Sequence, residues 1–176
     1  MADNATMRDR GQFWSPVPDW TKAALTGDGW TARRLEGVGQ TLVSGDIETA
    51  VGVLAHGAAE VGLWGLVDTG RVIVHIARGK ALIVTPSPLG VEPTWRAGFV
   101  ATPADDAWAV FEIAGPQLVG LVTQATAADL DAGSRSAALL FAGTPALLYR
   151  TAPHTARLHI EAPLATYLWN WLEGAR

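Results

Sequence analysis

The sequence contains no cysteine, few charged residues and no long apolar run. Without cysteine, the 176 residues can form no disulfide, thiolate metal site or cysteine nucleophile, which suits a reducing compartment. No apolar stretch approaches the roughly 20 residues that span a bilayer. Residues 1–13 mix acidic and basic side chains and do not resemble a signal peptide. We therefore expect a cytoplasmic protein.

Phosphate-binding signals are also missing. The formal net charge is -4, and the 13 basic residues are scattered along the chain, so nucleic acid is not an expected partner. Gly37-Val38-Gly39 lacks the third glycine of a dinucleotide-binding loop, and no Walker-type Gly-Lys-Ser/Thr sequence occurs. We predict no cofactor site on this chain.

Residue types that catalyse reactions occur without a catalytic arrangement. The four histidines lack the spacing of a zinc-binding helix: His56, His75, His154 and His159. Two carboxylate pairs lie beside Pro or Gly in predicted loops: Asp105 with Asp106, and Asp129 with Asp131. We interpret the histidines as structural or solvent-facing and the aspartates as turn or cap residues, and we predict no catalytic and no metal site.

Tryptophan is abundant, with eight residues against two Tyr and four Phe. Indoles suit interiors and interfaces, where they supply buried area and one hydrogen-bond donor. Residues 1–30 are predicted to form an N-terminal arm, which either wraps onto its own domain or lies on a partner. The candidate partner-interface residues are the aromatics of this arm and one from the last helix: Phe13, Trp14, Trp20, Trp30 and Trp169.

The body of the chain contains one unit of strand, glycine turn, helix and hairpin, used twice. In the first copy a strand at 41–43 leads to a helix with Asp46 as its N-cap, and the apolar spacing continues this helix to Val61. Strands at 72–77 and 81–84 then form a hairpin.

The second copy has a strand at 110–113, the turn Ala114-Gly115-Pro116 and a helix with Leu118, Leu121, Val122 and Ala125 on one face. Strands at 146–150 and 156–161 form its hairpin. In the last strand Leu158 and Ile160 alternate with Arg157, His159 and Glu161, which predicts one covered and one wet face.

These patterns predict an α+β fold of antiparallel or mixed sheets with helices on one face. After the arm, residues 31–176 form a single domain of two halves, about 35–86 and 107–173. The proline-rich residues 86–107 separate the halves. A final helix at 164–173 closes the chain, and Trp169 lies off its apolar face.

The segment Phe111-Glu112-Ile113-Ala114-Gly115-Pro116 resembles a signature of the glycine-cleavage aminomethyltransferase fold, whose N-terminal domain binds folate. Within that fold, the order of Asp129-Leu130, Gly133-Ser134, a hairpin and the aromatic helix at 167–172 resembles the sarcosine oxidase gamma subunit family. The resemblance covers residues 95–172 best. Arg78-Gly79-Lys80 and Ala101-Thr102-Pro103 depart from the motifs expected at their positions.

The resemblance implies a non-catalytic gamma subunit of a heterotetrameric complex that oxidatively demethylates sarcosine. Its partners would be larger flavoprotein subunits, chiefly the large one, and FAD, FMN, NAD and tetrahydrofolate would bind to those subunits. Two alternatives remain open: a free-standing folate-binding one-carbon transferase, and the equivalent subunit of a related dehydrogenase of N-methyl amino acids such as N-methylglutamate.

Overall fold

The computed structural model describes residues 16–176, which form two six-stranded sheets and three α-helices. In spatial order sheet A consists of β1 (Ala24–Gly27), β2 (Trp30–Leu35), β9 (Trp108–Ala114), β12 (Thr155–Glu161), β11 (Thr144–Ala152) and β10 (Ala138–Phe141). Sheet B consists of β7 (Thr94–Arg96), β8 (Phe99–Pro103), β3 (Gly39–Gly45), β6 (Lys80–Thr85), β5 (Val72–Ala77) and β4 (Ala59–Val61). The predicted α+β class is confirmed.

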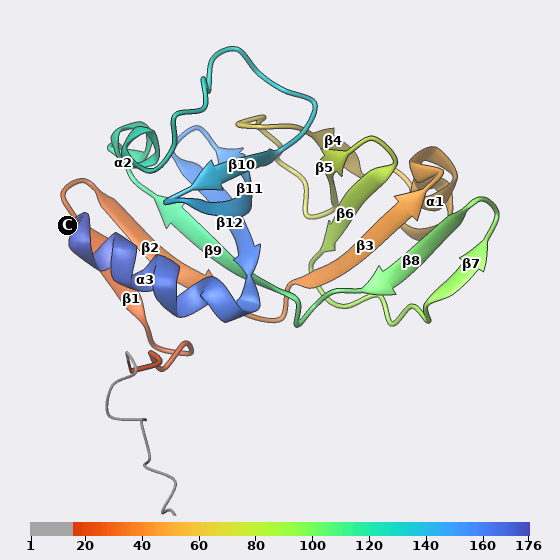
Figure 1. Cartoon of the computed structure of the whole chain (residues 1–176), viewed down its shortest axis with the longest axis horizontal. Helices are drawn as coiled ribbons and strands as arrows, with labels where there is room; N and C mark the ends of the chain where they lie inside the picture. The colour runs from red at the N-terminus through yellow and green to blue at the C-terminus, as the bar shows by residue number, and fades with distance from the viewer. Residues whose placement is uncertain (1–15) are drawn as a thin grey trace, which may run out of the picture.

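The two sheets repeat one arrangement, and each takes its first hairpin from elsewhere in the chain. Strand β3 leads into α1 (Ile47–Leu54), and β9 leads into α2 (Leu118–Ala125). The β1–β2 hairpin precedes β3 in sequence but pairs with β9, whereas β7–β8 precedes β9 but pairs with β3. The halves therefore exchange hairpins, which ties them together (Figure 1).

The glycine between strand and helix is required in both copies. Gly45 has φ +111° and Gly115 has φ +141°, values that side chains rarely adopt. A Cβ atom at Gly45 would collide with the carbonyl of Gly98, and one at Gly115 with the carbonyl of Gly29. Because both carbonyls belong to the exchanged hairpins, these glycines allow the hairpins to approach.

Local helix signals were predicted correctly in most places. Asp46 caps α1, since its carboxylate accepts hydrogen bonds from the backbone N–H of Thr49 at 3.0 Å and from its hydroxyl at 2.7 Å. All four predicted apolar residues of α2 are buried: Leu118, Leu121, Val122 and Ala125. A short 3-10 turn η2 (Ala162–Leu164) leads into α3 (Ala165–Gly174), close to the predicted last helix.

Three segments differ from their predictions. The helix expected to reach Val61 ends at Leu54, and β4 follows as a parallel partner of β5. The expected arm already contains β1, which pairs with β2, and the proline-rich separator contains the β7–β8 hairpin. Each of these strands is short, and each is stabilised by a partner strand that local periodicity does not reveal.

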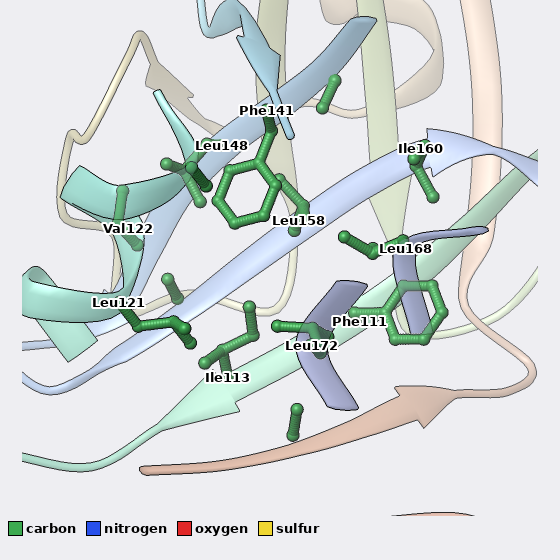
Figure 2. Packing of buried hydrophobic residues seen from close by; sticks show 14 of the residues in the cluster. Phe111, Ile113, Leu121, Val122, Phe141, Leu148, Leu158, Ile160, Leu168 and Leu172 are labelled. Atoms are coloured by element: carbon green, nitrogen blue, oxygen red, sulfur yellow. The ribbon is translucent and has the colours of Figure 1, made fainter. Parts of the chain in front are cut away.

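Helices and sheets form four layers with three apolar cores. The helix-side core of sheet A lies beneath α2 and α3 and includes Phe111, Phe141 and Leu158 (Figure 2). The helix-side core of sheet B lies beneath α1 and centres on Ile73, Ile83 and Phe99. The inter-sheet core joins the opposite faces of the two sheets and contains mainly Val72, Val74, Leu82, Val84, Leu147 and Tyr149. Each sheet is thus covered by helix on one face and by the other sheet on the opposite face.

Candidate functional site

A cleft of about 1010 Å³ opens at the β4–β5 side of sheet B. Its walls are the start of α1, strand β4, the β5–β6 turn and residues 133–136 from the second half of the chain. The backbone of Ser134 accepts a hydrogen bond from Leu63 N–H at 3.0 Å, and His75 O accepts one from Ala137 N–H at 2.8 Å. The cleft therefore forms where one half of the chain crosses the sheet edge of the other half.

The crossing requires a glycine at Gly62, directly after β4. A Cβ atom at Gly62 would collide with the carbonyl oxygen of Ser134. Ser136 holds the crossing segment by donating its hydroxyl to Ile76 O at 2.6 Å and accepting from Ala138 N–H at 3.1 Å. These contacts fix the position of the cleft wall that carries Arg135.

The charged side chains of the cleft differ in how they are paired. His75 Nε2 lies 3.0 Å from Glu60 Oε2, so the acid of the cleft is engaged by a neighbour. Arg78 and Arg135 also line the cleft, and within residues 16–176 neither makes an ion pair or a side-chain hydrogen bond. The cleft therefore has two guanidinium groups available to a ligand.

A buried polar network links the two sheets away from this cleft. His159 of β12 is 0% exposed, so the expectation that it lies on a wet face is wrong. Its Nδ1 lies 2.8 Å from Oε1 of Gln40, a residue of β3 in the other sheet, and its Nε2 lies 3.2 Å from the hydroxyl of Tyr149. The face of sheet A opposite its helices excludes water here because sheet B covers it.

Hydrogen-bond partners determine the tautomer of His159. The amide nitrogen of Gln40 donates to Trp108 O at 3.0 Å, which directs the amide oxygen of Gln40 toward the imidazole. Nδ1 must therefore carry the proton, while Nε2 accepts the hydroxyl proton of Tyr149. All polar atoms of the imidazole are then satisfied by protein groups.

Burial controls the protonation of this network. It lowers the pKa of His159 to about 3, and the positive charge of Arg157 acts in the same direction. Burial also raises the pKa of Tyr149, against a smaller opposing effect of Arg157. Both side chains are neutral near pH 7, and neither is exposed to solvent. The network therefore links the two sheets and is not open to a ligand from solution.

The predicted partner-interface residues occupy different positions from those expected. Trp30 is 4% exposed and Trp169 5% exposed, and both belong to the helix-side core of sheet A. Trp20 is half-buried and packs edge-on against Trp169 with ring centroids 5.4 Å apart. Trp169 lies off the expected apolar face, but Trp20 and β1 cover it. Trp30 and Trp169 are therefore core residues of this chain, Trp20 keeps part of its surface exposed, and Phe13 and Trp14 lie outside the described residues.

The other predicted polar residues have structural environments. Asp129 accepts hydrogen bonds from the backbone N–H of Asp131 at 3.0 Å and of Ala132 at 3.1 Å, which confirms a turn. Asp105 accepts from Gln40 N–H at 2.6 Å and so joins a loop to sheet B. His56 and His154 are exposed. Within the described residues no group of three His, Asp or Glu side chains could hold a metal ion.

Two surface features were not predicted. Trp95 of edge strand β7 is 68% exposed, and Leu140 of edge strand β10 is 61% exposed. The cleft was not predicted either, although Arg78-Gly79-Lys80 was predicted as a hairpin turn and Gly133-Ser134 belongs to the motif series that resembles the gamma subunit family. Their proximity depends on the crossing of the two halves, which no local pattern encodes. Among the helices of residues 16–176, none is long and apolar enough to cross a membrane.

Comparison with known proteins gives a likeness of fold. No family model and no curated protein sequence matches the chain. Among solved structures it is similar to a chain of the heterotetrameric sarcosine oxidase from Corynebacterium sp. U-96, in complex with pyrrole 2-carboxylate. The TM-score is 0.63 at 19% sequence identity, over 81% of this chain and 81% of that chain. The two chains share a fold.

Proposed function

We propose that this chain is the non-catalytic, gamma-type subunit of a sarcosine oxidase-like heterotetramer that oxidatively demethylates sarcosine or a related N-methylated amine. The fold likeness to a chain of such a heterotetramer carries the proposal. Because the likeness covers 81% of both chains, the two are about equal in length, and the gamma subunit is expected to be small. The order of the motifs from Phe111 to Trp171 supports the same family.

The proposal assigns the redox chemistry to partners. FAD, FMN, NAD and tetrahydrofolate would bind to the larger flavoprotein subunits, in a cytoplasmic complex. On this chain, His159 is enclosed between the sheets with both ring nitrogens bonded to protein groups. The imidazole of the cleft, that of His75, is paired with Glu60. These two environments suit structural roles rather than proton transfer to a substrate.

Assembly with the partners is the direct test. The full chain, carrying an affinity tag, is co-expressed with the candidate large flavoprotein and the other subunits encoded beside it. We expect flavin absorbance to co-elute with the tagged chain and sarcosine-dependent oxygen uptake only in the assembled complex. Failure of the chain to associate with any flavoprotein, or sarcosine oxidation by the chain alone, would remove the proposal.

The predicted arm gives a second, finer test. We propose Phe13 and Trp14 as partner contacts, so the double change Phe13→Ser with Trp14→Ser should weaken assembly about tenfold or more. Trp95→Ser removes an exposed indole from β7 and is the matched control, for which we expect an unchanged complex. Equal weakening by both variants would remove the arm from the proposal.

The same preparation separates the alternatives. Oxidation of N-methylglutamate in place of sarcosine, with an acceptor other than oxygen, would identify the related dehydrogenase. Calorimetric titration of the isolated chain with tetrahydrofolate should give no binding heat, because the folate site is proposed on the large subunit. Saturable heat would favour a free-standing folate-binding protein.

A further inference from the structure

We propose that the cleft beside β4 and β5 binds an organic carboxylate through Arg78 and Arg135. This inference goes beyond the proposed subunit role, which requires no small-molecule ligand on this chain. The two guanidinium groups come from different halves of the chain, one from the β5–β6 turn and one from the segment that crosses the sheet edge. The site therefore exists only in the folded chain.

The charge of the cleft favours an anion. Both arginines line it without an ion-pair partner among residues 16–176, although the whole chain carries a net charge of -4. The neighbouring Lys80 is exposed at the same turn and also makes no salt bridge in that range. A planar guanidinium donates two parallel hydrogen bonds to a carboxylate, which makes arginine the preferred residue for such ligands.

Polar groups beside the arginines supply further contacts. Ser134 Oγ accepts a hydrogen bond from Ser136 N–H at 3.1 Å, and its own proton remains free to be donated to a ligand. Ser136, in contrast, already uses its proton on Ile76 O. The cleft therefore offers one hydroxyl donor next to Arg135.

The remaining lining indicates a carboxylate attached to a short apolar body. Ile47, Val61 and Ala77 contribute apolar surface, and about 1010 Å³ is ample for a small organic acid. Glu60 brings a negative charge into the same cleft. A carboxylate with one charge is repelled less by Glu60 than a phosphate, which carries a larger charge near pH 7.

Nuclear magnetic resonance of the full ¹⁵N-labelled chain tests the proposal with pentanoate, a carboxylate of one charge on a short apolar chain, as the probe. We expect saturable shifts of the cleft amides, including those of Gly62, Gly79 and Ser134, with a Kd on the order of 1 mM. Inorganic phosphate should bind more weakly, and pentylamine, an apolar chain with the opposite charge, should not bind. A short glutamate-rich peptide tests whether the carboxylates can come from a protein segment: binding at the same amides would show that they can.

Three single variants distinguish a site from general attraction. Arg78→Gln and Arg135→Gln should each weaken pentanoate binding about tenfold, because each removes a charged donor. Arg96→Gln removes the same charge from β7, away from the cleft, and should leave the Kd unchanged. All three positions are exposed, so folding is preserved, and the dispersion of the spectrum confirms it.

Equal effects of all three variants, or shifts that do not saturate, would overturn the proposal. Assembly with the flavoprotein is measured separately, so failure here leaves the subunit proposal standing.

Discussion

Sheets A and B repeat one order of strands but differ in how firmly they are covered. Two helices lie on sheet A, and five aromatic residues fill the core beneath them: Trp30, Trp64, Phe111, Phe141 and Trp169. One helix lies on sheet B, where Phe99 is the aromatic residue of a core made largely of alanine, valine and isoleucine. Because buried area sets most of the stabilisation, sheet A forms the stable part of the molecule.

The difference extends to the surface. Helix α2 buries four residues, whereas α1 buries only Ala50. The open cleft lies at sheet B, as does edge strand β7, all of whose residues are exposed. Duplicating a fold therefore permits the two copies to differ: sheet A carries the bulk of the core, and the open cleft lies at sheet B.

The largest expected effect comes from a cavity in the helix-side core of sheet A. Phe111 is fully buried and lies edge-on to Trp20, with ring centroids 5.9 Å apart. Phe111→Ala should lower the free energy of unfolding by about 3–5 kcal/mol, since it opens a cavity among large rings. Phe99→Ala should lower the free energy of unfolding by about 3 kcal/mol, the lower end of that range, because the smaller side chains in the helix-side core of sheet B can move into the cavity. Urea denaturation measures both, and a larger loss at Phe99 would contradict the comparison.

The next effect tests the hydrogen-bonded network of His159 that links the two sheets. The pKa of His159 is about 3 when folded against 6.5 as its ordinary value, so between these pH values the unfolded chain binds the extra proton. The contribution of neutral, buried His159 to the free energy of unfolding is therefore complete above about pH 6.5 and is lost as the pH falls toward 3. The slope should approach about 1.4 kcal/mol per pH unit for this one group.

The matched variant for that experiment is His159→Gln, which keeps a buried hydrogen-bonding side chain without a titrating one. Between pH 6 and 4.5 the original protein should lose roughly 2 kcal/mol more than the variant. Urea midpoints at several pH values measure the difference. Parallel pH profiles would show that His159 does not titrate on unfolding, and would contradict its enclosure between the sheets.

The smallest expected effect compares the Arg33–Glu112 ion pair of sheet A with the Glu60–His75 contact of sheet B. Arg33 donates to Glu112 Oε1 from Nη2 at 2.7 Å and from Nε at 3.0 Å, whereas Glu60 has a single contact with His75 at 3.0 Å. Arg33→Gln should cost about 0.5–1 kcal/mol and Glu60→Gln less than about 0.5 kcal/mol, because Arg33 loses two charged hydrogen bonds and Glu60 one contact. Thermal unfolding at low and high salt measures both. A cost that survives 1 M salt would show that the Arg33–Glu112 pair is not acting through charge.

Local chemistry made much of the fold predictable. The glycine turns before α1 and α2, the Asp46 cap and the apolar face of α2 all depend on neighbours within a few residues. The β5–β6 and β11–β12 hairpins were predicted for the same reason, because their alternating residues surround short turns. The repeat of these signals in one order was also enough to predict a duplicated α+β body.

Pairing between distant segments caused the errors. The strands β1, β4, β7 and β8 are three to five residues long and exist because a partner strand supplies their hydrogen bonds. His159 alternates with apolar neighbours as a surface residue would, and only the second sheet makes its face dry. Trp169 likewise lies off the apolar stripe of α3, where Trp20 and β1 cover it.

By itself the sequence determined the local elements, their order and their duplication, since caps, turns and side-chain alternation act over short range. Tertiary structure decided which hairpin joins which sheet, which polar side chains lose contact with water, and that Arg78 and Arg135 line one cleft. The physical reason is that burial and charge proximity depend on packing between segments far apart in the chain, and no local pattern records which segments will meet.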